Sequence, residues 1–250
     1  MHNVILFYIY YFFPEKNPDI NQCIIYYSLA ANQNYFKAQA ALGNLYEEGK
    51  YATRDINKAI HYYSLAADQN HPESQFRLGN LYYEGLYVPR NIKEAIHYFT
   101  LAADQNNAHS QFMLGSLCYH RKYVDKAIYH YTLAANQKDA NAKYNLGIIY
   151  FNGEFVKRDY KKAINYLSQV DNDSFSSAQF LIGKIYCDRY NDYYNIDKAI
   201  YYLQIASDQN HPLAQAELGH IYIHEEFGRL DYKKALHYIK SKLFKRTIYS

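Results

Sequence analysis

The chain has 250 residues, of which 49% are hydrophobic, and it contains five Pro, ten Gly and no Trp. This composition predicts a chain that folds throughout, because it holds enough apolar surface for a sizeable core. The 27 basic and 24 acidic residues are interspersed and give a net charge of +3. Since nucleic-acid binding needs a basic stripe, we do not expect a nucleic-acid partner.

The cysteines and the N-terminus bear on the compartment. Cys23, Cys118 and Cys187 are scattered and predict neither a disulfide framework nor a thiolate metal site, which favours a cytoplasmic protein. The apolar run from Val4 to Phe13 has ten residues, about half the length that spans a bilayer, and it lacks the features of a secretory leader. We interpret it as a helix of a soluble protein, with membrane or secretory targeting as the less favoured alternative.

An internal repeat organises the sequence. The segment LGNLYEEG at 42–49 recurs as LGNLYYEG at 78–85, and this register has a period of 36 residues with one unit of 32. Its equivalent glycines are Gly43, Gly79, Gly115, Gly147, Gly183 and Gly219. We predict one solenoid domain over residues 1–250, with a degenerate unit at 1–37, where Phe7 replaces the glycine, and further units at 38–73, 74–109, 110–141 (shortened), 142–177, 178–213 and 214–250.

Each unit predicts two short helices, here called helix A and helix B. In the unit that begins at Ala38, apolar residues follow the i, i+3, i+4, i+7 spacing of an amphipathic helix up to Tyr46. Gly49 then occupies a position typical of a helix end, Asp55 is a residue type that caps the next helix, and Asn70 closes it. Neither helix can bury its apolar stripe alone, so the units must stack into an all-α solenoid.

The equivalent capping residues recur along the chain. Gly85 and Gly153 match the first helix end. The predicted N-caps of helix B are Asp19, Asp55, Asn91, Asp159, Asn195 and Asp231, and the predicted closing residues are Asn34, Asn70, Asn106 and Asn210.

The pattern AxxxLGxxY, then Gly, DxxKA, Tyr and AA resembles the Sel1-like repeat family, a branch of the tetratricopeptide-like helical repeats. The clearest match runs from Ala142 to Tyr166. The resemblance implies a right-handed superhelix that acts as an adaptor or scaffold in multiprotein assemblies, with helix A on the concave face. Three departures stand out: Tyr or His130 replaces the family's helix B aromatic, Tyr87 and Phe155 replace the second loop glycine, and the unit at 110–141 has lost its loop.

The repeats show where a partner would bind, because packing positions stay constant whereas positions that serve a ligand are free to vary. Three positions of helix A vary: the one before Leu-Gly, the one after Gly, and the one after the constant Tyr. Aromatic, Arg and Asn side chains at these positions suit peptide recognition, and Asn44 and Asn80 would form a short ladder. The candidate partner-binding residues are Asn44, Arg77, Asn80, Tyr83, Met113, Tyr119, Asn145, Phe151, Lys184 and Glu217.

Catalytic signatures are missing from the sequence. No GxSxG, P-loop, strand-linked GxGxxG or paired-carboxylate motif is present. His220 and His224 have the i, i+4 spacing of two metal ligands, but no third ligand follows at a recognisable spacing. We therefore expect no catalytic residue, no metal site and no cofactor.

Three functions compete at this stage. We favour a non-catalytic scaffold that binds a protein or peptide on helix A. One alternative is a hydrolase like the disulfide-rich bacterial members of the family that have been linked to β-lactam hydrolysis, although three cysteines cannot supply that framework. The other is a structural protein that self-associates through the apolar N-terminal helix. That helix could instead be covered by folding back on its own chain, by a partner, by a membrane surface or by a missing N-terminal extension.

Overall fold

The structure is a computed structural model that describes residues 20–170 and 176–238. The predicted apolar helix at Val4–Phe13 and the predicted cap Asp19 lie outside these residues. The chain divides into two compact units, Met1–Leu117 and Cys118–Ser250, and we describe each by itself. The single domain over residues 1–250 stays a prediction.

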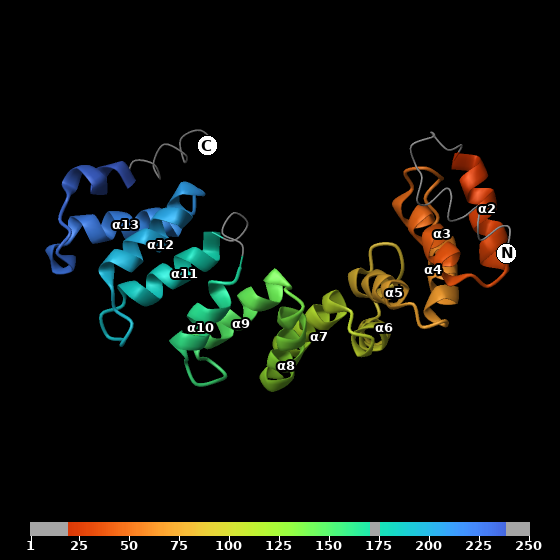
Figure 1. Cartoon of the computed structure of the whole chain (residues 1–250), viewed down its shortest axis with the longest axis horizontal. Coiled ribbons are helices and arrows are strands. Elements are labelled where there is room, and N and C mark those ends of the chain that lie inside the picture. Colours follow the sequence, from red (N-terminus) through yellow and green to blue (C-terminus); the bar gives the residue numbers. More distant parts are fainter. Residues whose placement is uncertain (1–19, 171–175, 239–250) are drawn as a thin grey trace. The chain divides into compact units, whose positions relative to one another are not determined.

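The described residues form helices and no strand (Figure 1). The A helices are α3 (Phe36–Glu48), α5 (Pro72–Glu84), α7 (Ala108–His120), α9 (Ala140–Asn152), α11 (Ser176–Cys187) and α13 (Pro212–Ile223). The B helices are α2 (Ile20–Asn32), α4 (Ile56–Ala67), α6 (Ile92–Asp104), α8 (Val124–Asn136), α10 (Tyr160–Leu167) and α12 (Ile196–Asp208). A short 3₁₀ helix, η2 (Glu225–Phe227), follows α13. Within each compact unit, consecutive helices pack against each other, so the predicted all-α solenoid is confirmed.

The predicted helix ends are confirmed as well. The side chains of Asp55, Asn91, Asp159 and Asn195 accept hydrogen bonds from backbone N–H groups in the first turn of helix B. The loop glycines have left-handed φ values of 66–67°, a conformation that glycine adopts without strain. The closing asparagines share it with φ of 59–68°.

Two further caps were not predicted from the sequence. The Nδ1 atom of His71 accepts a hydrogen bond from the backbone N–H of Ser74 at 3.3 Å, and His211 accepts one from Ala214 at 3.2 Å. Pro72 and Pro212, which follow these histidines, begin α5 and α13, where a missing N–H group costs nothing. Burial lowers the pKa of both histidines, which favours the neutral ring that can accept this hydrogen bond.

The constant glycine of helix A lies under one large side chain of helix B. A Cβ atom at Gly43 would lie 2.4 Å from the ring of Tyr63, and one at Gly79 would lie 2.6 Å from Phe99. The same close approach joins Gly147 to Leu167. The glycine is therefore needed because it lets the two helices of a unit approach within the thickness of one side chain.

Buried glutamines connect neighbouring units. The Nε2 atom of Gln75 donates to the carbonyl of Ala67, the last residue of α4, at 3.2 Å, and its Oε1 atom accepts from Gln105 at 2.8 Å. Gln39 repeats both bonds, with Ala31 and Gln69. Equivalent buried glutamines are Gln111, Gln179 and Gln215. In α9 the position is Lys143, whose side chain makes no hydrogen bond or ion pair with any described residue.

Paired tyrosines join helix A to helix B in five repeats. The constant Tyr of helix A stacks on the Tyr of helix B in five units, with ring centroids 5.8–6.1 Å apart and planes within 10°. In four of these units a lysine of helix B lies 4.8–5.2 Å from the centroid of the first ring. These stacks use ten of the 32 tyrosines of the chain as packing residues.

We predict that Gly79→Ala destabilises the protein by roughly 1–3 kcal/mol, because the added methyl group overpacks the contact with Phe99. The sign is informative, since the same exchange inside a free helix stabilises it by about 1 kcal/mol. Urea unfolding followed by circular dichroism measures the difference. Lys93→Ala, at an exposed position of α6, serves as the control and changes the free energy of unfolding by less than about 0.5 kcal/mol. A stabilised Gly79→Ala protein would contradict the packing role.

Candidate partner-binding surface

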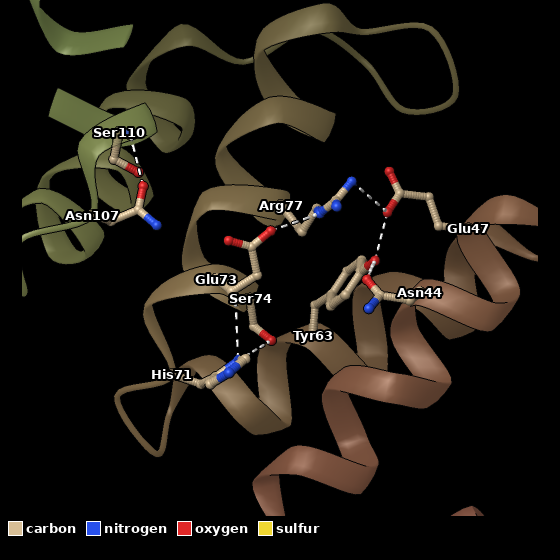
Figure 2. A network of polar contacts seen from close by, with 9 residues as sticks. All are labelled: Asn44, Glu47, Tyr63, His71, Glu73, Ser74, Arg77, Asn107 and Ser110. Carbon is tan, nitrogen blue, oxygen red and sulfur yellow. Dashed lines mark hydrogen bonds and ion pairs between the residues drawn. The ribbon is translucent and has the colours of Figure 1, made fainter. Parts of the chain in front are cut away.

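In the first compact unit (Met1–Leu117), residues of α3 and α5 form a polar network (Figure 2). The guanidinium of Arg77 pairs with Glu73 at 3.1 Å and lies 3.9 Å from the carboxylate of Glu47 in the preceding repeat. Both carboxylates are partly exposed. The predicted site residue Arg77 is therefore already held by its own chain, and it presents a fixed and partly neutralised charge.

Tyr63, a buried residue of α4, joins this network from the core. Its ring passes Gly43, and its hydroxyl donates to Asn44 Oδ1 at 2.7 Å and to Glu47 Oε2 at 2.5 Å (Figure 2). Burial, and then the hydrogen bond to Glu47, raises the pKa of Tyr63 far above its ordinary value. A core side chain thus fixes two residues of the helix A surface.

The predicted ladder of Asn44 and Asn80 does not consist of two equivalent groups. The oxygen of Asn44 is occupied by Tyr63, whereas Phe99 stands at the equivalent position of the next unit and has no hydroxyl for Asn80. Within the described residues, the half-buried amide of Asn80 makes no side-chain hydrogen bond. Next to it, Tyr83 lies against Phe99 and Arg90.

The remaining candidates are distributed over α7, α9, α11 and α13. Met113 is partly buried against the core around Phe99, and Asn145 is half-buried on α9. Tyr119 makes an edge contact with Phe155, at 6.4 Å between ring centroids. These residues are not gathered into one site, unlike the next group.

In the second compact unit (Cys118–Ser250), three successive A helices line one cleft of about 410 Å³, here called the helix A cleft. Phe151 comes from α9, Lys184 and Cys187 come from α11, and Glu217 comes from α13. Phe151, Lys184 and Glu217 are three of the candidate partner-binding residues predicted from the sequence. Tyr160 adds an aromatic wall beside Phe151, and η2 closes the end with Phe227.

Charged pairs shape the floor and the rim of the helix A cleft. Lys184 donates to Glu217 of the next repeat at 2.8 Å, with both side chains partly exposed. At the rim, Arg189 lies 3.5 Å from Glu226 and stacks over the ring of Phe227 at 5.1 Å. Burial raises the pKa of the Cys187 thiol to about 11, so this thiol stays protonated near neutral pH and is a poor nucleophile.

His220 of α13 lines this cleft, and His224 is the residue that follows α13. The rings of His220 and His224 are 4.2 Å apart. No group of three His, Cys, Asp or Glu side chains suited to a metal ion occurs among residues 20–170 and 176–238. In the same ranges no helix has the length and apolar character needed to cross a membrane.

Sequence reasoning missed the residues that support the site from other elements. Tyr63 belongs to a helix B position otherwise filled by apolar or aromatic core residues, and Tyr160, Arg189 and Phe227 come from loops and helix ends. The only available sign was the hydroxyl of Tyr63 at a position where Phe99 and Leu167 lack one.

We predict that Tyr63→Phe lowers the free energy of unfolding by about 1–3 kcal/mol near neutral pH, because two hydrogen bonds of a buried group are lost. A raised folded-state pKa stabilises the protein fully below the unfolded value of 10.0 and less as pH rises above it. The difference between wild type and variant should therefore shrink above about pH 10. Urea titrations across this range test it; a difference that stays constant would show that Tyr63 does not hold its proton in the folded state.

Comparison with known proteins agrees with this architecture. No curated protein sequence matches the chain. Among solved structures, c5321, described as a protective antigen of uropathogenic Escherichia coli with an SLR fold, shares 26% identity at a TM-score of 0.80. The match covers 90% of this chain and 49% of c5321, so the chain spans about half of that protein.

A second solved structure, a Sel1 repeat protein from Oxalobacter formigenes, shares 29% identity at a TM-score of 0.66, over 85% of this chain and 89% of that one. The family model described as Sel1 repeat matches seven times, at residues 10–35, 36–71, 72–107, 108–139, 140–169, 176–211 and 212–241. With a constant glycine, capped helix pairs and seven matched repeats, the chain belongs to the Sel1 repeat family.

Proposed function

We propose that this protein is a non-catalytic interaction scaffold that binds an extended segment of a partner protein along the A helices. The observation that carries the proposal is the helix A cleft, where three successive repeats contribute residues to one concavity. A repeat fold supplies such a row of positions without any change in its core.

The chemistry of the helix A cleft suits a peptide. Its volume of about 410 Å³ lies in the range of ligand sites, and Phe151 and Tyr160 supply aromatic area of the kind that anchors a partner side chain. The Lys184–Glu217 pair offers charged donors and acceptors at a fixed place. Since this pair is satisfied internally, it serves specificity more than affinity.

The first compact unit carries candidate residues at the equivalent positions of its own A helices. Asn80 has an amide free to pair with a ligand backbone, and it lies between Arg77 and Tyr83 on α5. The Tyr63 network fixes the neighbouring residues of α3. A surface held by its own core loses little conformational entropy on binding, which favours affinity.

Site-specific photocrosslinking in the native cell tests this proposal. A benzoylphenylalanine side chain replaces Phe151 or His220 in the helix A cleft, and as matched controls it replaces Tyr129 or Tyr201, which are both 61% exposed on B helices. We expect a discrete crosslinked partner from the two cleft positions and none from the controls.

The same partner should be lost when Lys184→Ala and Glu217→Ala are combined, after circular dichroism shows unchanged helicity. Crosslinks that arise equally from the B helix positions would contradict binding on the A helices. Absence of any crosslinked protein from both cleft positions would contradict the scaffold itself.

A further inference from the structure

The second compact unit has another concavity besides the helix A cleft. It has a volume of about 700 Å³ and lies between the loop at 153–159, which joins α9 to α10, and the loop at 188–195, which joins α11 to α12. We call it the loop cleft. Its floor includes Tyr150, which stacks on Tyr166 beneath the ammonium group of Lys162.

No hydrogen bond between described residues bridges the two loops of the loop cleft. In the first unit, Arg54 donates to the hydroxyl of Tyr87 in the next loop at 2.9 Å, so neighbouring loops are bridged. Arg158 and Asn191 occupy the same two positions in the second unit. Arg158 donates to the carbonyl of Asn152 at the end of α9 at 3.2 Å, a bond that Arg54 also makes with Glu48. The difference lies in Asn191, which has no phenol and donates to the carbonyl of Ile185 in α11 at 2.9 Å.

Both walls are held in place by internal hydrogen bonds. The N–H groups of Tyr190 and Tyr193 bond to the side chains of Asp188 and Asn191 at 3.0 and 2.7 Å. On the opposite wall, Asp159 accepts from the backbone of Lys162 at 2.9 Å. A preformed cleft of this kind binds with a small ordering cost.

The lining of the loop cleft is basic. Lys157, Arg158, Lys161 and Lys162 face two carboxylates, Asp159 and Asp192. Lys162 pairs with Asp159 at 3.8 Å. Lys157 and Lys161 are exposed, and neither makes an ion pair with any residue in the described part of the chain. The helix A cleft has the opposite balance, with Lys184 and Arg189 against three carboxylates.

Aromatic area accompanies these charges. Tyr190 is 99% exposed although it stands at the mouth of the cleft, and Tyr160 and Tyr193 also line it. Tyr160 and Tyr190 line the helix A cleft too, so the two clefts meet at these rings. The loop cleft therefore offers two unpaired ammonium groups beside exposed tyrosine faces.

We propose that the loop cleft binds an acidic stretch of polypeptide, whose carboxylates pair with Lys157 and Lys161 and whose backbone lies along the tyrosines. Ammonium groups act as point charges and suit spaced carboxylates. A phosphate group would favour a free arginine fork, but the guanidinium of Arg158 is engaged by Asn152 and lies over Tyr160.

Fluorescence anisotropy with the full chain tests the loop cleft separately from the helix A cleft. The probes are a fluorescein-labelled Glu-rich peptide, the same peptide with Gln for every Glu, and a labelled single-stranded oligothymidylate. The cleft variant combines Lys157→Glu with Lys161→Glu. The control combines Lys93→Glu with Lys233→Glu, which changes the net charge equally. Lys93 on α6 and Lys233 in the helical segment at 232–238 are both exposed and occupy the same repeat position as Lys161.

We expect the Glu-rich peptide to bind, the Gln peptide to bind at least about tenfold more weakly, and the cleft variant to lose about tenfold in affinity for the Glu-rich peptide. The control variant should stay within about twofold of wild type. Equal losses in both variants would overturn the proposal in favour of general charge attraction. Tighter binding of oligothymidylate, lost in the cleft variant, would overturn the assignment to a peptide, and so would failure of the Glu-rich peptide to bind.

Discussion

The contact between the helix A glycine and one large side chain of helix B sets the distance between the two helices of a unit. Without a Cβ atom at Gly43 the ring of Tyr63 lies directly on the backbone of α3, and its hydroxyl emerges among the residues of the opposite surface. The variable surface is therefore supported from inside the core.

The protein carries two different surfaces on this one frame. The A helices contribute side chains that vary from repeat to repeat, and cross-repeat pairs such as Lys184–Glu217 fix them. The connecting loops vary in another way: they are bridged where Arg54 meets Tyr87 and separate where Asn191 replaces the tyrosine. A one-residue difference in a loop thus decides whether two neighbouring loops are bridged or leave a cleft between them.

The fold followed from the sequence because its determinants are local. Loop glycines, the N-caps Asp55 and Asp159 and the closing asparagines each act within a few residues, and their spacing is visible without a structure. The candidate site was predicted in part: Phe151, Lys184 and Glu217 do line one cleft. The rest could not be predicted, because the opening between two loops depends on a side-chain contact between loops of successive repeats, such as that of Arg54 with Tyr87, and a repeat pattern does not show which loop residues meet.

The replacement of a buried glutamine by Lys143 has a consequence for how the chain comes apart. In a linear array, stability is the sum of the stability of each unit and a coupling to each neighbour. A glutamine that bridges two helices strengthens that coupling, as Gln75 does for α4 and α5, and α9 lacks this bridge to α8. Coupling across the α8–α9 junction should therefore be weaker than across the α4–α5 junction. Under denaturing stress we expect α8 and α9 to separate more readily than α4 and α5, which favours a partly folded intermediate over a single all-or-none transition.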